Sequence, residues 1–287
     1  MSKLGGLIGA VVGIGSGIAL IVLLPGIGGW IILGVLLVAT VVGYVVANKY
    51  VSSAASPCEC PEGDFTRYLL VGLNAGLNGV LAGKIYALIF GTAAGVVLAT
   101  ALAALSMLAI FGSISTNDIY QAFLGWANWL LPTSWLIVLL GFLFWIVSGL
   151  GHLFGYVIGR SNYFRIQMMR ADWKTGTFFT RGGLIANLNP IDTAFNMGTF
   201  AFVDAKPHLP PEESPEWHLE HEAGHTLNLG AFGSIFHLIG AIDENVTGGG
   251  HEAFSERLAE SNDPATTLAD IIIPMWAPGP SSTRQPI

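Results

Sequence analysis

The chain has 287 residues, of which 52% are hydrophobic and 11% are charged, and its formal net charge at pH 7 is -7. Soluble domains carry about 25% charged residues, so this composition argues against an ordinary soluble protein. The acidic residues lie mostly after residue 200, and no cluster of Lys and Arg with interleaved aromatic residues could follow a phosphate backbone, which argues against a nucleic-acid partner. Because the apolar surplus lies before residue 160, we expect a membrane part followed by a soluble part.

Two apolar runs at the start of the chain, residues 5–24 and 31–47, predict a transmembrane hairpin. Each is long enough to cross a hydrocarbon core of ~30 Å at ~1.5 Å per residue. The first run exceeds the ~7 to 15 apolar residues of a secretory signal, and a second run follows at once. Gly5, Gly9 and Gly13 are spaced for close helix contact in lipid. We interpret them as packing the chain's own spans, with homo-oligomerisation as the alternative.

The polar insert over residues 48–67 contains the only two cysteines, Cys58 and Cys60. A disulfide across a single intervening residue is strained, which argues against a disulfide framework. A CxC pair also resembles half of a metal site, but we interpret these residues as incidental thiols.

A second apolar block covers residues 68–111 and is too long for one simple span. We expect a third span over residues 85–111 and a shorter, glycine-rich interfacial or re-entrant segment over residues 68–83. A fourth span is expected over residues 135–158. No span carries the chain of acidic or basic residues that marks an ion route, which argues against a conducting pore.

The cations indicate an orientation for the four spans, because all of them fall on one side of this arrangement. They are Lys3, Lys49, Arg67, Lys84, Arg160, Arg165 and Arg170. By the positive-inside rule, both termini and the whole region after the last span are cytoplasmic, given a bacterial-type inner membrane.

The polar half begins with strand patterns and continues into a helix. The segments TFFTRG and AFNMGTFAFVDA predict strands separated by turn residues. A helix is expected to begin at Pro215, with Ser214 as its N-cap and Glu216 at the positive end of its dipole. Gly230 marks its expected end, which gives about four turns.

The segment HEAGH within this helix carries the pattern of a metal site. His221 and His225 are four residues apart, so both imidazoles project from one helix face and can bind one ion. Glu222 emerges beside that face, where it can accept a proton from a water on the metal. We therefore predict a Zn2+ site with Glu222 as general base.

Two histidines leave such a site one protein ligand short. The favoured third ligand is Glu256, on a predicted second helix in HEAFSERLAES, with Glu260 one turn later placed to orient a ligand histidine through a hydrogen bond. The reserve candidates are Glu244, its neighbour Asp243, and His237. His237 and His251 are also candidates for stabilising an oxyanion.

HEAGH, together with GTFAFV upstream and FSERLAES downstream, resembles the gluzincin type of HExxH zinc metallopeptidases, and more particularly bacterial membrane proteins with an HExGHT segment. The resemblance covers residues 194–261. It implies zinc ligation by His221 and His225 with Glu222 as base, and an edge strand around residues 198–203 that pairs with an extended substrate. In the gluzincins an ExxxD pair supplies the third ligand, whereas here Glu256 is followed four residues later by Glu260.

The expected fold is a multi-span α-helical membrane domain over residues 1–158, a small α+β zincin-like domain over residues 159–270, and a flexible tail over residues 271–287. The expected activity is hydrolysis of protein or peptide substrates at the membrane. Two alternatives stay open. One is a non-enzymatic membrane assembly or pore with a structural zinc site; the other is a toxin-like effector that inserts its spans in a target membrane and uses the same residues.

Overall fold

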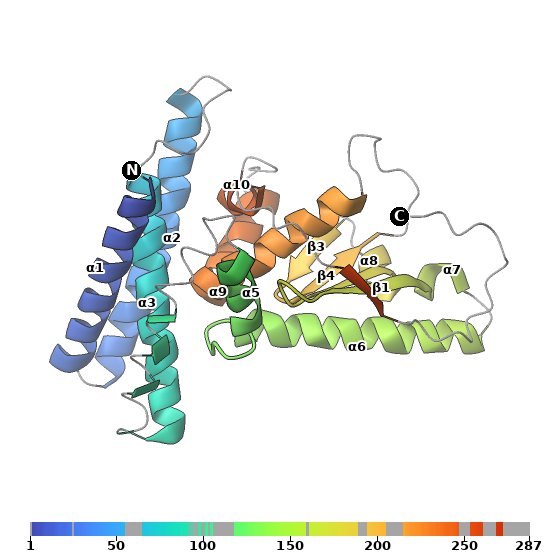
Figure 1. Cartoon of the computed structure of the whole chain (residues 1–287), viewed down its shortest axis with the longest axis horizontal. Helices are drawn as coiled ribbons and strands as arrows, with labels where there is room; N and C mark the ends of the chain where they lie inside the picture. The colour runs from blue at the N-terminus through green and yellow to red at the C-terminus, as the bar shows by residue number, and fades with distance from the viewer. Residues whose placement is uncertain are drawn as a thin grey trace.

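The structure is a computed structural model that describes residues 2–24, 26–54, 65–91, 118–158, 161–188, 194–204, 215–246, 253–260 and 268–271, with scattered positions between 93 and 105. This part combines a bundle of three long helices with a layered unit of helices and a five-stranded sheet (Figure 1). The predicted tail begins at the last residue of strand β5 (Leu268–Ile271), and residues 272–287 are not among those described. The predicted domain boundaries stay a prediction.

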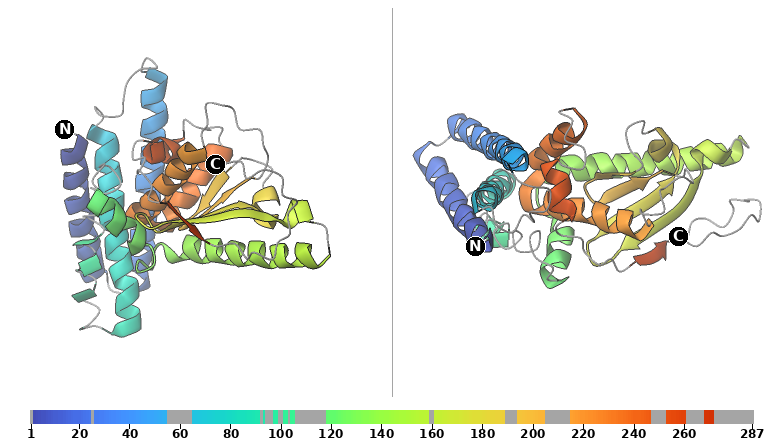
Figure 2. Two further views of the ribbon diagram at one scale, coloured as in Figure 1. Left: turned by 45° about the vertical axis from the view of Figure 1, so that its right-hand side comes forward. Right: turned by 90° about the horizontal axis from the view of Figure 1, so that it is seen from above.

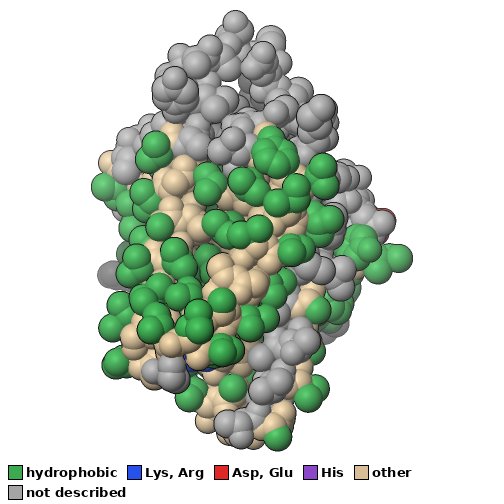
Figure 3. Space-filling view, turned by 90° about the vertical axis from the view of Figure 1, so that its left-hand side faces the viewer, with side chains coloured by type: hydrophobic (Ala, Val, Ile, Leu, Met, Phe, Trp, Pro, Cys, Tyr) green, Lys and Arg blue, Asp and Glu red, His purple; other side chains and the backbone are tan. Residues whose placement is uncertain are grey.

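Helices α1 (Ser2–Leu23), α2 (Ile27–Ala54) and α3 (Phe65–Phe90) form the bundle. Their outer faces expose aliphatic side chains over a broad surface with hardly any charge (Figure 3). Helix α1 lies directly against α3, because glycines on both helices let the two backbones meet. The glycines that we singled out in α1 all face α3 of the same chain. The alternative of a homo-oligomer stays a prediction and would need another face.

Four helices are long and apolar enough to cross a membrane: Leu4–Leu23, Ile27–Val46, Tyr68–Phe90 and Trp135–Val157. The number agrees with the prediction, but the third span does not. Residues 68–83 belong to the continuous helix α3 and are not a separate interfacial segment. The span expected over residues 85–111 does not begin as predicted, because α3 ends at Phe90, and most of its remaining residues lie outside those described.

Buried asparagines explain this error. Asn74 interrupts the apolar run, yet it is buried in the bundle, where its Nδ2 donates a hydrogen bond to Thr40 Oγ1 at 3.0 Å. Asn78 is buried as well. Both polar groups face protein and not lipid, so they do not interrupt a membrane helix.

The position of Lys84 also corrects the predicted orientation. Its ammonium lies 4.4 Å from the ring centroid of Trp30, at the start of α2. Lys84 is therefore at the end of the bundle where α1 turns into α2, away from Lys3 and Lys49. The cations do not all lie on one side.

The sheet has the strand order β3-β4-β2-β1-β5. Strands β2 and β4 are parallel, and the other pairs are antiparallel. The remaining strands are β1 (Ile166–Asp172), β2 (Thr177–Gly182), β3 (Ala194–Met197) and β4 (Phe200–Val203). The prediction from TFFTRG is confirmed as β2, and AFNMGTFAFVDA forms the hairpin of β3 and β4. Strands β1 and β5 were not predicted.

The expected edge strand is a further correction. Strand β4 lies between β3 and β2, and β3 is the edge. The hairpin turns at Gly198, whose φ of 80° suits glycine, and this turn folds β3 back along the outer side of β4.

Two long helices cover the two faces of the sheet. Phe200 and Phe202 point to α6 (Trp135–Val157), whereas Ala201 between them points to α9 (Pro215–Asn245), as the alternation of a strand requires. Helix α6 runs crosswise to α1, α2 and α3 in both views of Figure 2. Three short helices complete the packing: α5 (Asp118–Ala127), α7 (Ser161–Phe164) and α8 (Leu184–Leu188).

Helix α9 begins at Pro215 as predicted, while the predicted cap Ser214 is not among the described residues. It does not end at Gly230. Gly230 is a position of close packing, since an added Cβ would lie 2.7 Å from the carbonyl oxygen of Leu124 in α5. The break comes at Gly233, with φ 78° and ψ 177°, and α9 then continues to Asn245. An added Cβ at Gly233 would overlap the Asn78 side chain of α3.

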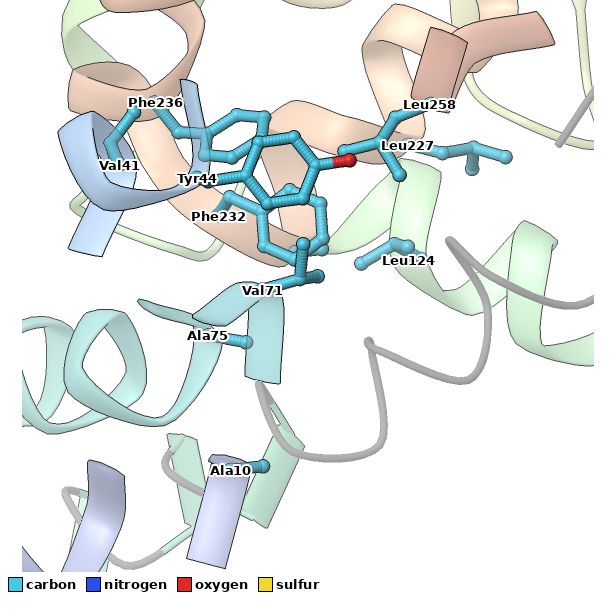
Figure 4. Packing of buried hydrophobic residues seen from close by; sticks show 11 residues of the cluster. Ala10, Val41, Tyr44, Val71, Ala75, Leu124, Leu227, Phe232, Phe236 and Leu258 are labelled. Carbon is cyan, nitrogen blue, oxygen red and sulfur yellow. The ribbon is translucent and has the colours of Figure 1, made fainter. Parts of the chain in front are cut away.

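One hydrophobic core joins the bundle to α9 (Figure 4). Phe232 and Phe236 of α9 pack with ring centroids 4.6 Å apart and planes tilted by 42°, and the ring of Tyr44 of α2 lies 6.5 Å from that of Phe236. Val71 of α3 and Leu258 belong to the same cluster. The membrane helices and the helix that carries HEAGH therefore fold against each other.

The contact between α1 and α3 generates the first prediction. We expect Gly72→Ala to lower the free energy of unfolding by roughly 1 to 3 kcal/mol, because the added methyl group overlaps the carbonyl oxygen of Gly6. Gly15→Ala is the matched control, since its Cβ would have no neighbour within 4 Å. Thermal unfolding in detergent measures both, and equal midpoints for the two variants would refute this account of the bundle.

Candidate metal centre

His221 and His225 lie one turn apart on α9 and are both buried. Their Nε2 atoms are 3.1 Å apart, and the two rings are nearly perpendicular with centroids 4.8 Å apart. Nitrogens aimed at one point from the same helix face are the arrangement that the spacing of HEAGH predicts.

Glu256 on α10 (Phe254–Glu260) completes the group. Its Oε2 is 2.9 Å from Nε2 of His221, and its Oε1 is 3.2 Å from Nε2 of His225. The ligand atoms of the three residues all lie within 4.8 Å of one another, and all three side chains are buried. Such a group could bind a metal ion.

The charges of this group are coupled. Burial raises the pKa of Glu256, but the charge of His225 and the hydrogen bonds from both histidines outweigh it and hold that pKa well below the usual range. Burial lowers the pKa of His221, yet the hydrogen bond with Glu256 and the charge of Glu222 leave it raised. Positive charge from the histidines thus keeps this buried carboxylate ionised, and a bound cation could supply the same charge.

Close packing brings α10 to α9. Gly224, the fourth residue of HEAGH, has no side chain to keep α10 away: an added Cβ would lie 2.7 Å from the carbonyl oxygen of Ala259. Asn228, one turn later, donates from Nδ2 to the carbonyl of Ser255 at 3.3 Å. These contacts place Glu256 opposite the two histidines.

A buried polar network fixes α9 to the edge of the sheet. Asn196 on β3 donates from Nδ2 to the backbone carbonyl of Glu222 at 2.8 Å and to Thr226 Oγ1 at 3.1 Å. The Thr226 hydroxyl in turn donates to the carbonyl of Gly198 at 2.8 Å and accepts from Thr177 at 3.0 Å. The sequence analysis did not identify Asn196, Thr226 or Thr177 as residues that position the site. The only local indication in the sequence was that the polar residue Thr226 directly follows HEAGH.

Glu222, the predicted base, is buried beside the group with 4% of its surface exposed. Its charge contributes to the raised pKa of His221. Its backbone is held by Asn196, so the turn that carries it is fixed from the sheet side.

Three of the other predicted residues, His237, Asp243 and Glu244, do not belong to the group. His237 donates from Nε2 to the backbone carbonyl of Asn196 at 3.1 Å, and its ring lies 6.3 Å from that of His225. Asp243 and Glu244 lie in the last turns of α9, beyond the break at Gly233, and are not members of the ligand group. Glu260 ends α10, but its side chain, like His251, lies outside the part of the structure that is described.

No protein-family model, no curated protein and no solved structure matches the chain. The metal centre is therefore argued from its own geometry, and the resemblance to gluzincins stays a prediction.

The ligand group generates a prediction about metal binding. We expect Glu256→Ala to weaken binding of a divalent transition metal by more than the roughly 10- to 100-fold typical of losing a residue that only orients a ligand. Glu244→Ala is the control, because it removes a carboxylate outside the group. Calorimetric titration after chelation gives both affinities. If the control variant lost the metal and Glu256→Ala kept it, Glu256 would not be a ligand.

A second prediction concerns pH and the metal-free protein. Burial and the charge of His225 lower the pKa of His237 to about 4. Since the unfolded histidine titrates near 6.5, the folded state loses stability as pH falls from 6.5 towards 4. The raised pKa of His221 has the opposite effect on stability: the stability that protonated His221 contributes is lost as the pH rises above 6.5. Stability of the metal-free protein should therefore peak near pH 6.5.

Replacing the titrating ring tests this directly. His237→Gln keeps a donor for the Asn196 carbonyl but cannot gain a proton, so the loss between pH 6.5 and 4.5, roughly 2 to 3 kcal/mol in the parent, should shrink. Denaturant unfolding with chelator at several pH values measures it. If His237→Gln lost as much free energy of unfolding between pH 6.5 and 4.5 as the parent does, other groups would be responsible for the loss.

Proposed function

We propose that this protein is a membrane-anchored zinc metallopeptidase that hydrolyses peptide bonds with Glu222 as general base. The observation that carries the proposal is the buried group of His221, His225 and Glu256, whose ligand atoms converge from two helices, with Glu222 buried next to His221 in the chain. A structural role alone does not call for a general base at this position.

The donor set fits zinc. Two imidazole nitrogens and one carboxylate are the ligands of many catalytic zinc sites, with bonds of ~2.0 to 2.2 Å. Tetrahedral ligands at that bond length are separated by about 3.3 Å, by geometry from the same bonds. The measured separations of 2.9, 3.1 and 3.2 Å need only a small outward movement to admit the ion.

The residues divide the chemistry between them. When bound, zinc would supply a Lewis acid that polarises the substrate carbonyl and lowers the pKa of a water molecule. Glu222 would accept the proton of the attacking water and pass it to the leaving amine. His221, His225 and Glu256 would hold the ion. Asn196 would keep α9 in place by donating to the Glu222 carbonyl and the Thr226 hydroxyl, and Thr226 would do so by donating to the Gly198 carbonyl.

The number of ligands favours catalysis over a structural zinc staple. A structural site is closed by four protein ligands, whereas a catalytic site has three and an open position. Within the described part of the chain the group has three members. His251 lies outside that part, so His251→Ala tests one candidate for a fourth ligand: a staple that used His251 would lose zinc, and the proposed enzyme would keep it.

The membrane helices define where the enzyme would act. Four helices are long and apolar enough to cross a membrane. We place the protein in a bacterial inner membrane, and its substrates are proteins or peptides at the membrane. The common core of α2, α3 and α9 would hold the metal centre close to the spans.

The test is a pair of single-atom exchanges on α9. We expect Glu222→Gln to keep zinc and to lower peptidase activity by at least ~10²- to 10⁴-fold, the usual contribution of a general base. Glu220→Gln removes an acidic group two residues away, outside the ligand group, and should keep both zinc and activity. Zinc content and cleavage of a quenched fluorescent peptide library are measured in parallel. Full activity in Glu222→Gln would end the proposal.

A further inference from the structure

The break in α9 at Gly233 lies against the middle of the bundle of α1, α2 and α3. An added Cβ at Gly233 would overlap the Asn78 side chain of α3. Ile235, two residues further along α9, packs against a hydrophobic cluster to which each helix of the bundle contributes. Its members include Ile14 of α1, Leu37 of α2 and Leu77 of α3. The break in α9 is therefore level with these residues.

These residues hold central positions in the helices that are long and apolar enough to cross a membrane. Ile14 and Leu37 are each the eleventh residue of a 20-residue span, and Leu77 is the tenth residue of a span of 23. With α1, α2 and α3 as spans, the break in α9 is therefore near the centre of the membrane.

The metal centre is close to this break along the same helix. His225 precedes Gly233 by eight residues, or about 12 Å of helix, whereas half of a 20-residue span is about 15 Å. The first part of α9 is inclined to the bundle, so the difference in depth is smaller than its length (Figure 1). In addition, Leu227 belongs to the same hydrophobic core as Ala10 and Ala75, which lie within the spans. The packing thus brings the metal centre to the depth of the spans.

The described surface beside the spans is poor in charge. After α3, Asp118 is the only exposed charged residue among those whose exposure is described, and its carboxylate is paired with Lys174 at 2.7 Å. The second part of α9 exposes Leu238, Ile242 and Val246, which recur every four residues and so lie on one face. Helices α6 and α9 cover the two faces of the sheet, and non-helical backbone is tolerated at membrane depth where protein encloses it.

We propose that the metal centre acts within the depth of the membrane and that its substrates are membrane-embedded segments of other proteins. An apolar segment is already at this depth, whereas a polar peptide would have to give up its hydrogen bonds to water to reach it. The substrate class rests on the proposed peptidase activity. The depth of the centre rests on packing alone, so it can hold or fail without deciding that activity.

The first experiment measures the depth of α9 in a bilayer. A single cysteine replaces Leu238 in the full chain, with Cys58 and Cys60 changed to Ser, and carries a nitroxide label. Reference labels replace Leu4, at the end of the exposed side of α1, and Val11, near its centre. Each protein is reconstituted in phosphatidylcholine vesicles, and depth is obtained from the relative accessibility to oxygen and a nickel chelate.

Leu238 is five residues beyond Gly233, so its label should lie within about 8 Å of the centre of the bilayer. We expect a depth close to that of the label at Val11 and greater than that of the label at Leu4. Since all three side chains are exposed, the labelled proteins should unfold at the temperature of the parent. If the label at Leu238 were more open to the nickel chelate than the label at Leu4, α9 would lie in water and the proposal would be wrong.

The second experiment tests the substrate class with two sets of quenched fluorescent peptides that share randomised central positions. One set has flanks of Leu and Ala that make it long enough to cross the bilayer, and the other has flanks of Lys and Glu that keep it in water. We expect the protein in vesicles to cleave the apolar set at least ~10-fold faster, which corresponds to about 1.4 kcal/mol in the barrier. Glu222→Gln is the negative control for both sets.

The outcomes separate the two proposals. Equal or faster cleavage of the water-soluble set would overturn the substrate class and leave the peptidase activity standing. Cleavage of neither set by the zinc-loaded protein would count against both the substrate class and the proposed function, while the label at Leu238 would still decide the depth of the centre.

Discussion

Helix α9 has to contact three neighbours at once, and the rest of the structure depends on this constraint. Each neighbour comes close at a glycine: α10 at Gly224, α5 at Gly230, and α3 at Gly233. The same helix buries Leu219 and Ala223 against the sheet and Phe232 against the bundle. A side chain at any of the three glycines would meet a carbonyl oxygen or the Asn78 amide, so the sequence of α9 is restricted by packing as much as by chemistry.

The metal centre follows from that packing. Two imidazoles and a carboxylate are buried together, and the carboxylate remains ionised because positive charge is beside it. Removing that charge without replacement would leave an unpaired buried anion, which costs several kcal/mol. Binding of a metal ion to this group would therefore be coupled to the folding of this region, where Asn196 and Thr226 join the helix to the sheet by a hydrogen bond.

Local patterns in the sequence predicted what is local in the structure. The spacing of HEAGH, the start of α9 at Pro215 and strand β2 depend on residues close together in the chain. The errors concern long-range contacts. Asn74 was interpreted as an interruption of a span because its hydrogen bond to Thr40 joins residues far apart in the chain. Gly230 was predicted to end the helix, whereas it allows close contact with Leu124. Strand β4 was predicted to be an edge strand because its pairing with β3 was not foreseen. Glu256 was one of several acidic residues, and only tertiary packing selects it.

Glu256 follows His221 by 35 residues and lies on the last helix described, whereas α1, α2 and α3 come first in the chain. A ribosome that makes the chain from its N-terminus therefore completes the apolar helices before the carboxylate exists. The two histidines are present by then without their third partner. The order of synthesis thus leaves the group of His221, His225 and Glu256 incomplete until α10, the last helix described, docks against α9.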